Sequence, residues 1–284
     1  MGMKKYSILA VLLLAVSALS CNKAEIPASV PEEEITVSYN VSLDNMTKAI
    51  GKGETVNYVW YATYKAIEND GVVTYILKSD PKMEPIVEGN AECSVTMVRN
   101  QSYKVVFLAQ YYDDNNVPAY SILENTARLS MPAAPAANSD NYDLFGFTDT
   151  VVNFHGFGNK SAELTRRVAQ LNFNADAADL SAAQALGKTP ESSAVKLTGV
   201  PQYLYLLDWT TSSETMDVNY SKAPLTGTPN ELATVFSLSG SQGNDVNASL
   251  YIYKGNEKIK EYTSIADVPT QANYRTNLKV SYTF

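Results

Sequence analysis

The 284-residue sequence has few of the side chains on which catalytic and metal sites depend. It contains one histidine, His155, and two cysteines, Cys21 and Cys93. Zinc fingers and iron–sulfur clusters need a full set of such ligands, so both are excluded. One histidine also makes acid–base catalysis hard to assemble, and the Gly-x-Ser-x-Gly and His-Glu-x-x-His motifs are absent. We therefore expect no enzyme, no metal and no cofactor, although a glycosidase built on paired carboxylates is left open.

Positive charge and long apolar runs are scarce as well. The chain has 22 Lys and Arg against 30 Asp and Glu, a formal net charge of −8. A nucleic-acid partner needs a basic face, so we expect none. Beyond the N-terminus no segment approaches the roughly 18 consecutive apolar residues of a membrane span. Hydrophobic residues still make up 45% of the chain, which is enough for a packed core.

The N-terminus is typical of an export signal. Lys4 and Lys5 precede an apolar stretch, residues 6–19, that is too short to span a bilayer comfortably. Small residues then lead to Cys21, so we expect a secretory signal peptide over residues 1–20.

The segment Ala18-Leu19-Ser20-Cys21 resembles a bacterial lipobox, with Ala18 where leucine is commoner. In a lipobox the cysteine receives a diacylglycerol and becomes the acylated N-terminus, so lipidation with fatty acids such as palmitate is expected at Cys21. A plain signal peptide with a chance cysteine is the alternative. Residues 21–34 contain two prolines and three consecutive glutamates, which predicts a solvated tether.

The rest of the sequence predicts β-strands almost throughout. Residues 35–43 alternate apolar and polar side chains, which indicates a strand with one buried face. Residues 175–186 are alanine-rich and form the one expected helix. Further strands are expected at 56–65, 72–77, 94–98, 103–111, 165–173, 194–197, 203–207, 233–238, 246–253, 258–262 and 277–284.

Many short strands separated by turns indicate sandwiches or barrels. At this length we expect two β-sandwiches in tandem, residues 35–158 and 159–284. Residues 113–116 resemble a calcium loop in composition, but a hairpin turn is the preferred interpretation. Cys93 alternates with Val95 and Met97, so it is interpreted as a buried core residue rather than a reactive thiol.

Three runs of sequence resemble the fimbrillin-like lipoproteins of Bacteroidales, in the type V pilin superfamily, including a related domain family of unassigned function. They are Thr47-Lys48-Ala49-Ile50, the run from Arg166 to Phe173, and the run from Asn273 to Leu278. The resemblance implies an all-β chain with two tandem transthyretin-like sandwiches and one short helix in the second. It also implies a lipid-anchored location on the surface of the outer membrane.

In the pilus-forming members of that family, a trypsin-like protease cuts an early loop and frees an N-terminal strand, which a strand of the next subunit replaces. The resemblance makes residues 35–43 the removable strand, 277–284 a donor strand, and Lys48 the candidate cleavage site. Pilins often carry arginine at this point, and an arginine-specific protease recognises lysine poorly. The alternatives are an uncut monomer, an anchor or terminal subunit, and an ordinary loop lysine.

Two further hypotheses concern surface chemistry. Asp149-Thr150-Val151 resembles the O-glycosylation pattern of exported Bacteroidales proteins, which makes Thr150 a candidate acceptor, with an ordinary strand or turn as the alternative. The rival function is a carbohydrate-binding surface lipoprotein, in which Trp60, Trp209 and exposed tyrosines stack on sugars; aromatic side chains packed in the cores are the alternative. The expected partners are the outer membrane, other pilin subunits, and host or bacterial glycans or proteins.

Overall fold

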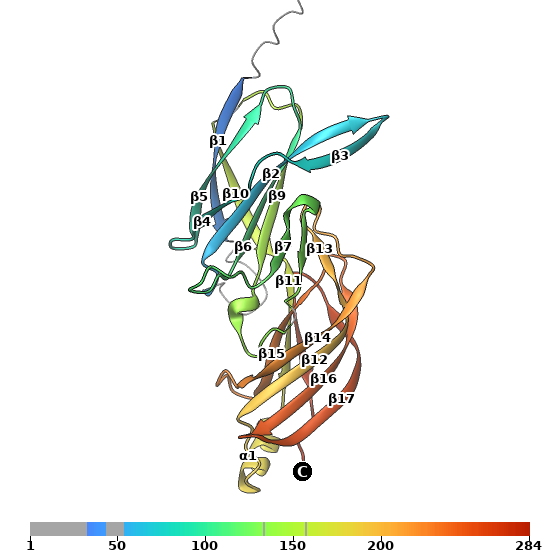
Figure 1. The fold of residues 1–284 in the computed structure, drawn as a ribbon. Helices are drawn as coiled ribbons and strands as arrows, with labels where there is room; N and C mark the ends of the chain where they lie inside the picture. Colours follow the sequence, from blue (N-terminus) through green and yellow to red (C-terminus); the bar gives the residue numbers. More distant parts are fainter. Residues whose placement is uncertain (1–32, 44–53, 133, 157) are drawn as a thin grey trace, which may run out of the picture. The chain divides into compact units, whose positions relative to one another are not determined.

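The computed structural model describes residues 33–284 except 44–53, 133 and 157, and it is built almost entirely from β-strands (Figure 1). The predicted all-β class is therefore confirmed. In chain order the strands are β1 (Glu34–Leu43), β2 (Tyr58–Asn69), β3 (Val72–Leu77), β4 (Lys82–Pro85), β5 (Asn90–Val98), β6 (Tyr103–Gln110), β7 (Ser121–Leu123), β8 (Arg128–Ser130), β9 (Phe145–Val151), β10 (Asn159–Arg166), β11 (Val168–Asn174), β12 (Ser192–Pro201), β13 (Tyr203–Tyr205), β14 (Thr215–Pro224), β15 (Glu231–Leu238), β16 (Asn244–Lys254), β17 (Glu257–Thr270) and β18 (Arg275–Lys279).

The first sandwich consists of β1–β6, β9 and β10. Its strands pair in the order β3-β2-β6-β9-β10-β1-β5, with β4 on β2. The path turns back at β10, whose residues 159–164 pair with β1 while Thr165 and Arg166 pair with β9. Because β10 changes partners in this way, β1 and β5 form one layer of the sandwich, which packs against the layer of β2, β6 and β9. The buried side chains between the two layers include Val37, Tyr39, Val41, Cys93, Val95, Met97, Val105, Phe107, Phe145, Ala162 and Leu164.

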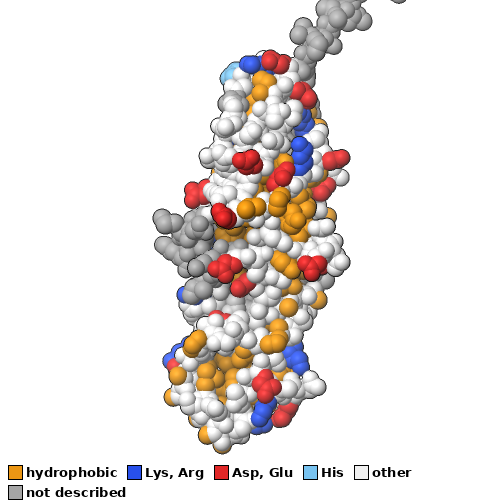
Figure 2. All heavy atoms as spheres, turned by 90° about the vertical axis from the view of Figure 1, so that its left-hand side faces the viewer, with side chains coloured by type: hydrophobic (Ala, Val, Ile, Leu, Met, Phe, Trp, Pro, Cys, Tyr) orange, Lys and Arg blue, Asp and Glu red, His pale blue; other side chains and the backbone are white. Residues whose placement is uncertain are grey.

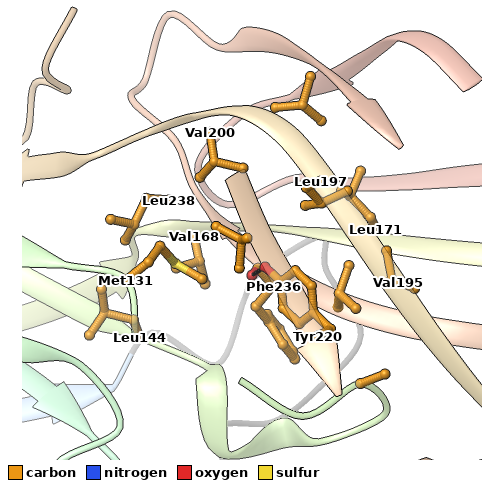
Figure 3. Close-up of a cluster of buried hydrophobic side chains, with 14 of the residues drawn as sticks. Met131, Leu144, Val168, Leu171, Val195, Leu197, Val200, Tyr220, Phe236 and Leu238 are labelled. Atoms are coloured by element: carbon orange, nitrogen blue, oxygen red, sulfur yellow. Dashed lines mark hydrogen bonds between the residues drawn. The ribbon is translucent and has the colours of Figure 1, made fainter. Parts of the chain in front are cut away.

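The second sandwich packs the sheet β15-β11-β18 against the sheet β14-β12-β16-β17. Every second residue of the facing strands points inward, as the two-residue period of a strand requires. Figure 3 shows Leu171, Val195, Leu197 and Phe236 converging in this core. Helix α1 (Ala177–Ala185) follows β11 and lies within the predicted 175–186. Among the described residues no helix is long and apolar enough to cross a membrane.

One hydrophobic cluster joins the two sandwiches. The outer face of β2 and β6 places Trp60, Tyr64 and Leu108 in the same buried cluster as the second core. The small sheet β13-β8-β7 contributes Leu129 and Leu204 to it. By its contacts, Glu34–Phe284 forms a single compact unit.

The expected domain boundary at 158/159 falls before β10, which belongs to the first sheet system. Backbone pairing places the change of sheet at Arg167, between β10 and β11. The division into two tandem domains stays a prediction. The predicted strand 165–173 is interrupted at Arg167 because its N–H bonds to the carbonyl of Leu144 (2.8 Å), outside both ladders.

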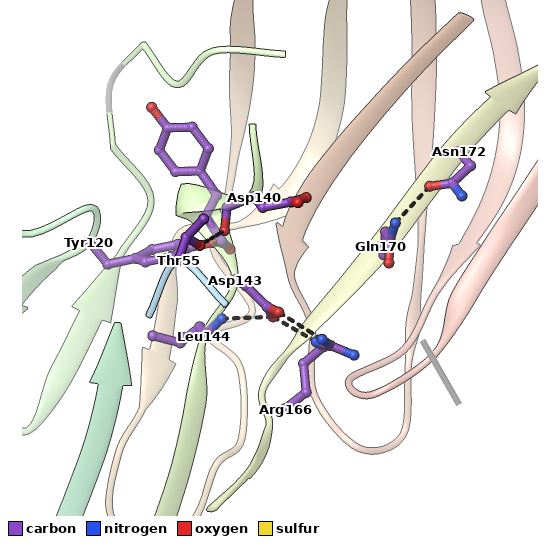
Figure 4. A network of polar contacts seen from close by, with 9 residues as sticks. Thr55, Tyr120, Asp140, Asp143, Leu144, Arg166, Gln170 and Asn172 are labelled. Atoms are coloured by element: carbon purple, nitrogen blue, oxygen red, sulfur yellow. Dashed lines mark hydrogen bonds and ion pairs between the residues drawn. The ribbon is translucent and has the colours of Figure 1, made fainter. Parts of the chain in front are cut away.

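A buried ion pair fixes this crossing point (Figure 4). Arg166 donates from Nε to Oδ1 of Asp143 (2.6 Å) and from Nη2 to Oδ2 (2.7 Å). Both side chains are almost fully buried. Burial raises the pKa of Asp143, while the hydrogen bonds and charge of Arg166 lower it. The two-pronged geometry ties the end of β10 to the segment that enters β9.

Two other strand predictions need correction. The final strand, expected at 277–284, is β18 (Arg275–Lys279), and residues 280–284 lie outside any strand. Strand β14 was not expected at all, because within it only Val218 and Tyr220 are buried. The predicted turn at 113–116 is confirmed: Oδ1 of Asp113 accepts bonds from the N–H groups of Asn115 (2.9 Å) and Val117 (2.8 Å).

Candidate strand-exchange site

Strand β1 is hydrogen-bonded on both sides. It runs antiparallel to β5, from the pair Glu34–Val98 to the pair Ser42–Asn90. On its other edge it runs parallel to β10, from Ser38–Asn159 to Leu43–Leu164. Removing β1 would therefore leave two strand edges with unpaired backbone groups, and such edges are templates for another strand.

The inner face of β1 is buried, as the alternation of the sequence predicts. Val37, Tyr39, Val41 and Leu43 are at most 8% exposed. The alternate residues, from Glu34 to Asn40, face solvent. A slip of one residue would bury the polar set, so this pattern specifies a single register.

The cleft that β1 fills is apolar on both walls. Strand β5 contributes Ala91, Cys93, Val95 and Met97, and β10 contributes Ala162 and Leu164; all are buried. Phe107 of β6 forms the floor, with its ring centroid 4.8 Å from that of Tyr39. Apolar walls with two open edges are what an alternating strand needs in order to bind.

One polar cluster interrupts this apolar cleft. The hydroxyl of Tyr39 donates to Oδ2 of Asp149 in β9 (2.8 Å), and the ammonium of Lys160 in β10 forms an ion pair with the same carboxylate. The ammonium also lies 5.7 Å from the centroid of the Tyr39 ring. Burial, followed by the charge of Asp149, raises the pKa of Tyr39 well above its ordinary value, so the phenol remains a hydrogen-bond donor.

This cluster lies where β9 and β10 part. The two strands pair only at Gly146–Thr165 and Phe145–Arg166, and beyond that point β10 turns to β1. Asp149 and Lys160 therefore link two strands that no longer share backbone hydrogen bonds. The sequence pattern around Asp149 indicates only a glycosylation motif, because the ion pair joins residues of two different strands.

Cys93 lies directly opposite Tyr39 in the ladder between β1 and β5. The cysteine is 1% exposed, and burial raises the pKa of its thiol to about 12. A buried thiol with little thiolate is unreactive. The interpretation of Cys93 as a core residue is confirmed.

The candidate residues Cys21 and Lys48 lie outside the described residues, so lipidation and cleavage stay predictions. Thr150 is exposed on β9, where it pairs with Lys104 of β6. An exposed hydroxyl is accessible to a transferase, but glycosylation of Thr150 also stays a prediction.

The two tryptophans do not form a surface platform for sugars. Trp60 is 4% exposed and lies in the cluster between the sandwiches. Trp209 is 8% exposed, with its ring against Gly146 and the guanidinium of Arg167 4.4 Å from its centroid. Both tryptophans therefore belong to the packed interior, as the alternative interpretation predicts.

The C-terminal segment packs against the second sandwich. Among the described strands, β18 shares a backbone ladder with β11 alone. Beyond β18, Val280 and Tyr282 are buried, and the hydroxyl of Tyr282 donates to the carbonyl of Lys188 (3.1 Å). The expected donor segment thus exists as an alternating apolar stretch, but it is folded onto its own chain.

Charged side chains are interspersed on the surface. On the face shown in Figure 2, acidic and basic groups lie singly or in small groups among uncharged ones. This face presents no field of a single sign to steer a highly charged partner. The apolar cleft under β1 is therefore the stronger candidate for an interaction site.

A family model matches residues 27–281, nearly the whole chain, and describes a family of unknown function, DUF6562. No curated protein sequence matches.

Solved structures with a similar fold come from Bacteroidales. They include a fimbrial assembly protein from Parabacteroides distasonis (14% identity, 89% of this chain and 94% of that chain, TM-score 0.42). A proposed cell adhesion protein from Bacteroides ovatus has 10% identity, the same coverage and a TM-score of 0.47. A proposed polysaccharide-binding protein from Bacteroides thetaiotaomicron has 10% identity, 80% coverage of both chains and a TM-score of 0.45. At these values the likeness carries no argument about function.

Proposed function

The chain belongs to the DUF6562 family, whose function is unknown, and we propose that it is a fimbrillin-like surface lipoprotein that assembles by exchange of strand β1. In this proposal the protein is a structural or adhesive pilus subunit, or the anchor of one. The observation that carries it is the position of β1: the first described strand is buried on its inner face and paired along both edges.

Only the segment 44–53 joins β1 to the rest of the folded chain. A cut there leaves β1 held by its hydrogen bonds and by Val37, Tyr39, Val41 and Leu43. At about 1.5–3 kcal/mol for each buried side chain, these four contribute roughly 6–12 kcal/mol. A cut chain therefore keeps β1 until another strand of the same pattern takes its place, which is exchange rather than simple loss.

The backbone geometry supports strand addition rather than the binding of a folded surface. An incoming strand would find hydrogen-bonding edges on β5 and β10 and apolar walls for every second side chain. Such a site gains affinity from the backbone and register from the side chains. A folded partner could reach neither the edges nor the walls.

The anchoring part of the proposal rests on the sequence. Acylation of Cys21 would hold the protein at the outer membrane, since several acyl chains anchor a protein stably whereas one does not. Residues 22–34 would act as the tether. If Lys48 is not cut, the same protein serves as a lipid-bound anchor or terminal subunit, because β1 then stays in its own chain.

The test uses the soluble chain of residues 22–284 with a trypsin-like protease, followed by size-exclusion chromatography with light scattering. We expect a cut near Lys48 and species larger than the monomer. The matched control, Lys48→Gln, should stay uncut at this position and monomeric. A chain that is cut near Lys48 and nevertheless remains monomeric at high concentration would contradict the proposal.

A further inference from the structure

Two segments near opposite ends of the described chain share a sequence pattern. Residues 35–41 read Ile-Thr-Val-Ser-Tyr-Asn-Val, and residues 278–284 read Leu-Lys-Val-Ser-Tyr-Thr-Phe. Aligned without a gap, both place apolar side chains at the first, third, fifth and seventh positions. The central Val-Ser-Tyr is identical, so Tyr282 corresponds to Tyr39.

The shared tyrosine matters because its position in the cleft is polar. Val37 and Val41 lie in the hydrophobic cluster of the first sandwich, and many alternating strands could supply such residues. The hydroxyl of Tyr39, by contrast, reaches the carboxylate that Lys160 also binds. Hydrogen bonds to a charged acceptor are stronger than those between neutral groups.

A phenylalanine at this position would bury the same ring and leave the carboxylate without its second donor. A short residue would also leave a cavity beside Phe107. The cluster therefore discriminates by chemistry as well as by size. It would also fix register, because a strand shifted by two residues places a different side chain against Asp149.

We propose that Asp149 and Lys160 select a strand that carries a tyrosine at the position of Tyr39. Residues 278–284 of a second copy of this chain, which lie within the donor strand that the family resemblance implies, meet this requirement. This inference rests on the proposed function. In the register of the alignment, Val280 takes the place of Val37 and Tyr282 the place of Tyr39. Tyr282 then lies opposite Cys93 of the accepting chain, as Tyr39 does.

The donor segment must first leave its own sandwich. There the N–H of Tyr282 donates to Oδ2 of Asp179 (2.9 Å) and its hydroxyl donates to the carbonyl of Lys188. The segment is also held by the N–H of Val280, which donates to the carbonyl of Asn174 (2.8 Å), and by Tyr262 and Lys260, which donate to the carbonyls of Ser281 (2.7 Å) and Thr283 (2.6 Å). Exchange breaks these contacts, replaces a neutral acceptor for the hydroxyl of Tyr282 with a charged one, and forms strand ladders on both sides of the segment.

The experiment uses the chain from residue 22 with residues 46–51 replaced by the recognition sequence of a specific protease. The cut chain is incubated with an excess of fluorescent peptide, and binding is measured by anisotropy. Three peptides are compared: residues 34–43, residues 275–284, and residues 275–284 with Tyr282→Phe. A chain with Asp149→Asn serves as the matched acceptor variant.

We expect the 275–284 peptide to bind and its Tyr282→Phe form to bind about tenfold more weakly. On the Asp149→Asn chain the two forms should differ much less. Protection of the Cys93 thiol in the uncut Asp149→Asn chain shows that this variant folds.

Equal affinity of the two 275–284 peptides for the native acceptor would overturn the selection by Asp149 and Lys160. Binding of the 34–43 peptide but not the 275–284 peptide would overturn the assignment of the donor, while the proposed function stands. If no peptide binds, the inference and the proposed function both fail.

Discussion

The sole thiol of the chain from residue 22 can report whether β1 leaves its site. Cys93 is 1% exposed and lies opposite Tyr39, and burial raises its pKa to about 12. At pH 8 a thiol reagent such as 5,5′-dithiobis(2-nitrobenzoate) should therefore react only when β1 opens. In the uncut chain we expect labelling to be slow and to accelerate only near the urea midpoint of unfolding.

After a cut in the segment 44–53, the rate of labelling measures the release of β1. Tyr39→Phe removes one hydrogen bond to a charged acceptor, a contribution of about 1.5–3 kcal/mol. When opening is in fast equilibrium, this loss corresponds to about 10- to 100-fold faster labelling. The control Ser38→Ala alters an exposed neighbour and should leave the rate unchanged. Equal rates for Tyr39→Phe and the unmodified chain would refute the role given to the Asp149 contact.

Three further outcomes are expected, each measured by urea unfolding. Arg166→Met leaves Asp143 buried without its cation and should lower the free energy of unfolding by about 3–5 kcal/mol, whereas the double variant Arg166→Met with Asp143→Leu should recover much of this loss. An equal loss of stability in the single and the double variant would contradict the pairing of Arg166 with Asp143. Gly146→Ala should destabilise by about 1–3 kcal/mol, because its Cβ would lie 2.1 Å from the Trp209 ring, and an unchanged midpoint would show that the ring can move away. Because folding raises the pKa of Cys93, the unfolded chain loses the thiol proton at a lower pH than the folded chain does, so the free energy of unfolding should fall as the pH rises from 9 towards 12. The fall should be smaller for Cys93→Ala, and an identical fall in this variant would contradict the raised pKa of Cys93.

The strand β1 and the burial of Cys93 were predictable because both depend on a two-residue period that is visible in the sequence. The period assigns Val37, Tyr39 and Val41 to one face without any knowledge of the neighbouring strands. It also placed Cys93 with the apolar residues of β5. Where one face of a strand is buried and the other is exposed to solvent, the alternation in the sequence matches the burial of its side chains in the structure.

The polar contacts were not predictable from the same pattern. Tyr39 and Asp149 are 110 residues apart, and they meet only because β9 and β10 part at this point. The pairing of Arg166 with Asp143 likewise depends on the chain changing sheets at Arg167. Local periodicity carries no information on which distant strands lie together.

The tryptophans and the C-terminus show a second limit. An aromatic side chain suits a sugar platform or a core equally well, and only the packing of the two sandwiches showed that Trp60 and Trp209 are buried. Residues 280–284 alternate like a strand but lie outside every strand of the described chain, and the backbone N–H of Val280 donates to the carbonyl of Asn174 in β11. An alternating pattern shows that a segment can pair, and the partner has to be found in the structure or in another copy.

A cross-link between two copies tests the central claim most directly. In the chain cut in segment 44–53, strand exchange in the register of the alignment places Ser281 at the position of Ser38, opposite the exposed Ser94 of the next copy. With Ser94→Cys and Ser281→Cys together, Tyr282 stays in place and the two new thiols lie at a spacing that a disulfide can bridge. We expect a disulfide-linked ladder on a non-reducing gel, with the joined peptides identified by mass spectrometry, and none for Ser94→Cys with Lys279→Cys, whose thiols are two residues out of register. Monomer alone for the Ser94/Ser281 pair, or equal cross-linking by both pairs, would contradict strand exchange in this register.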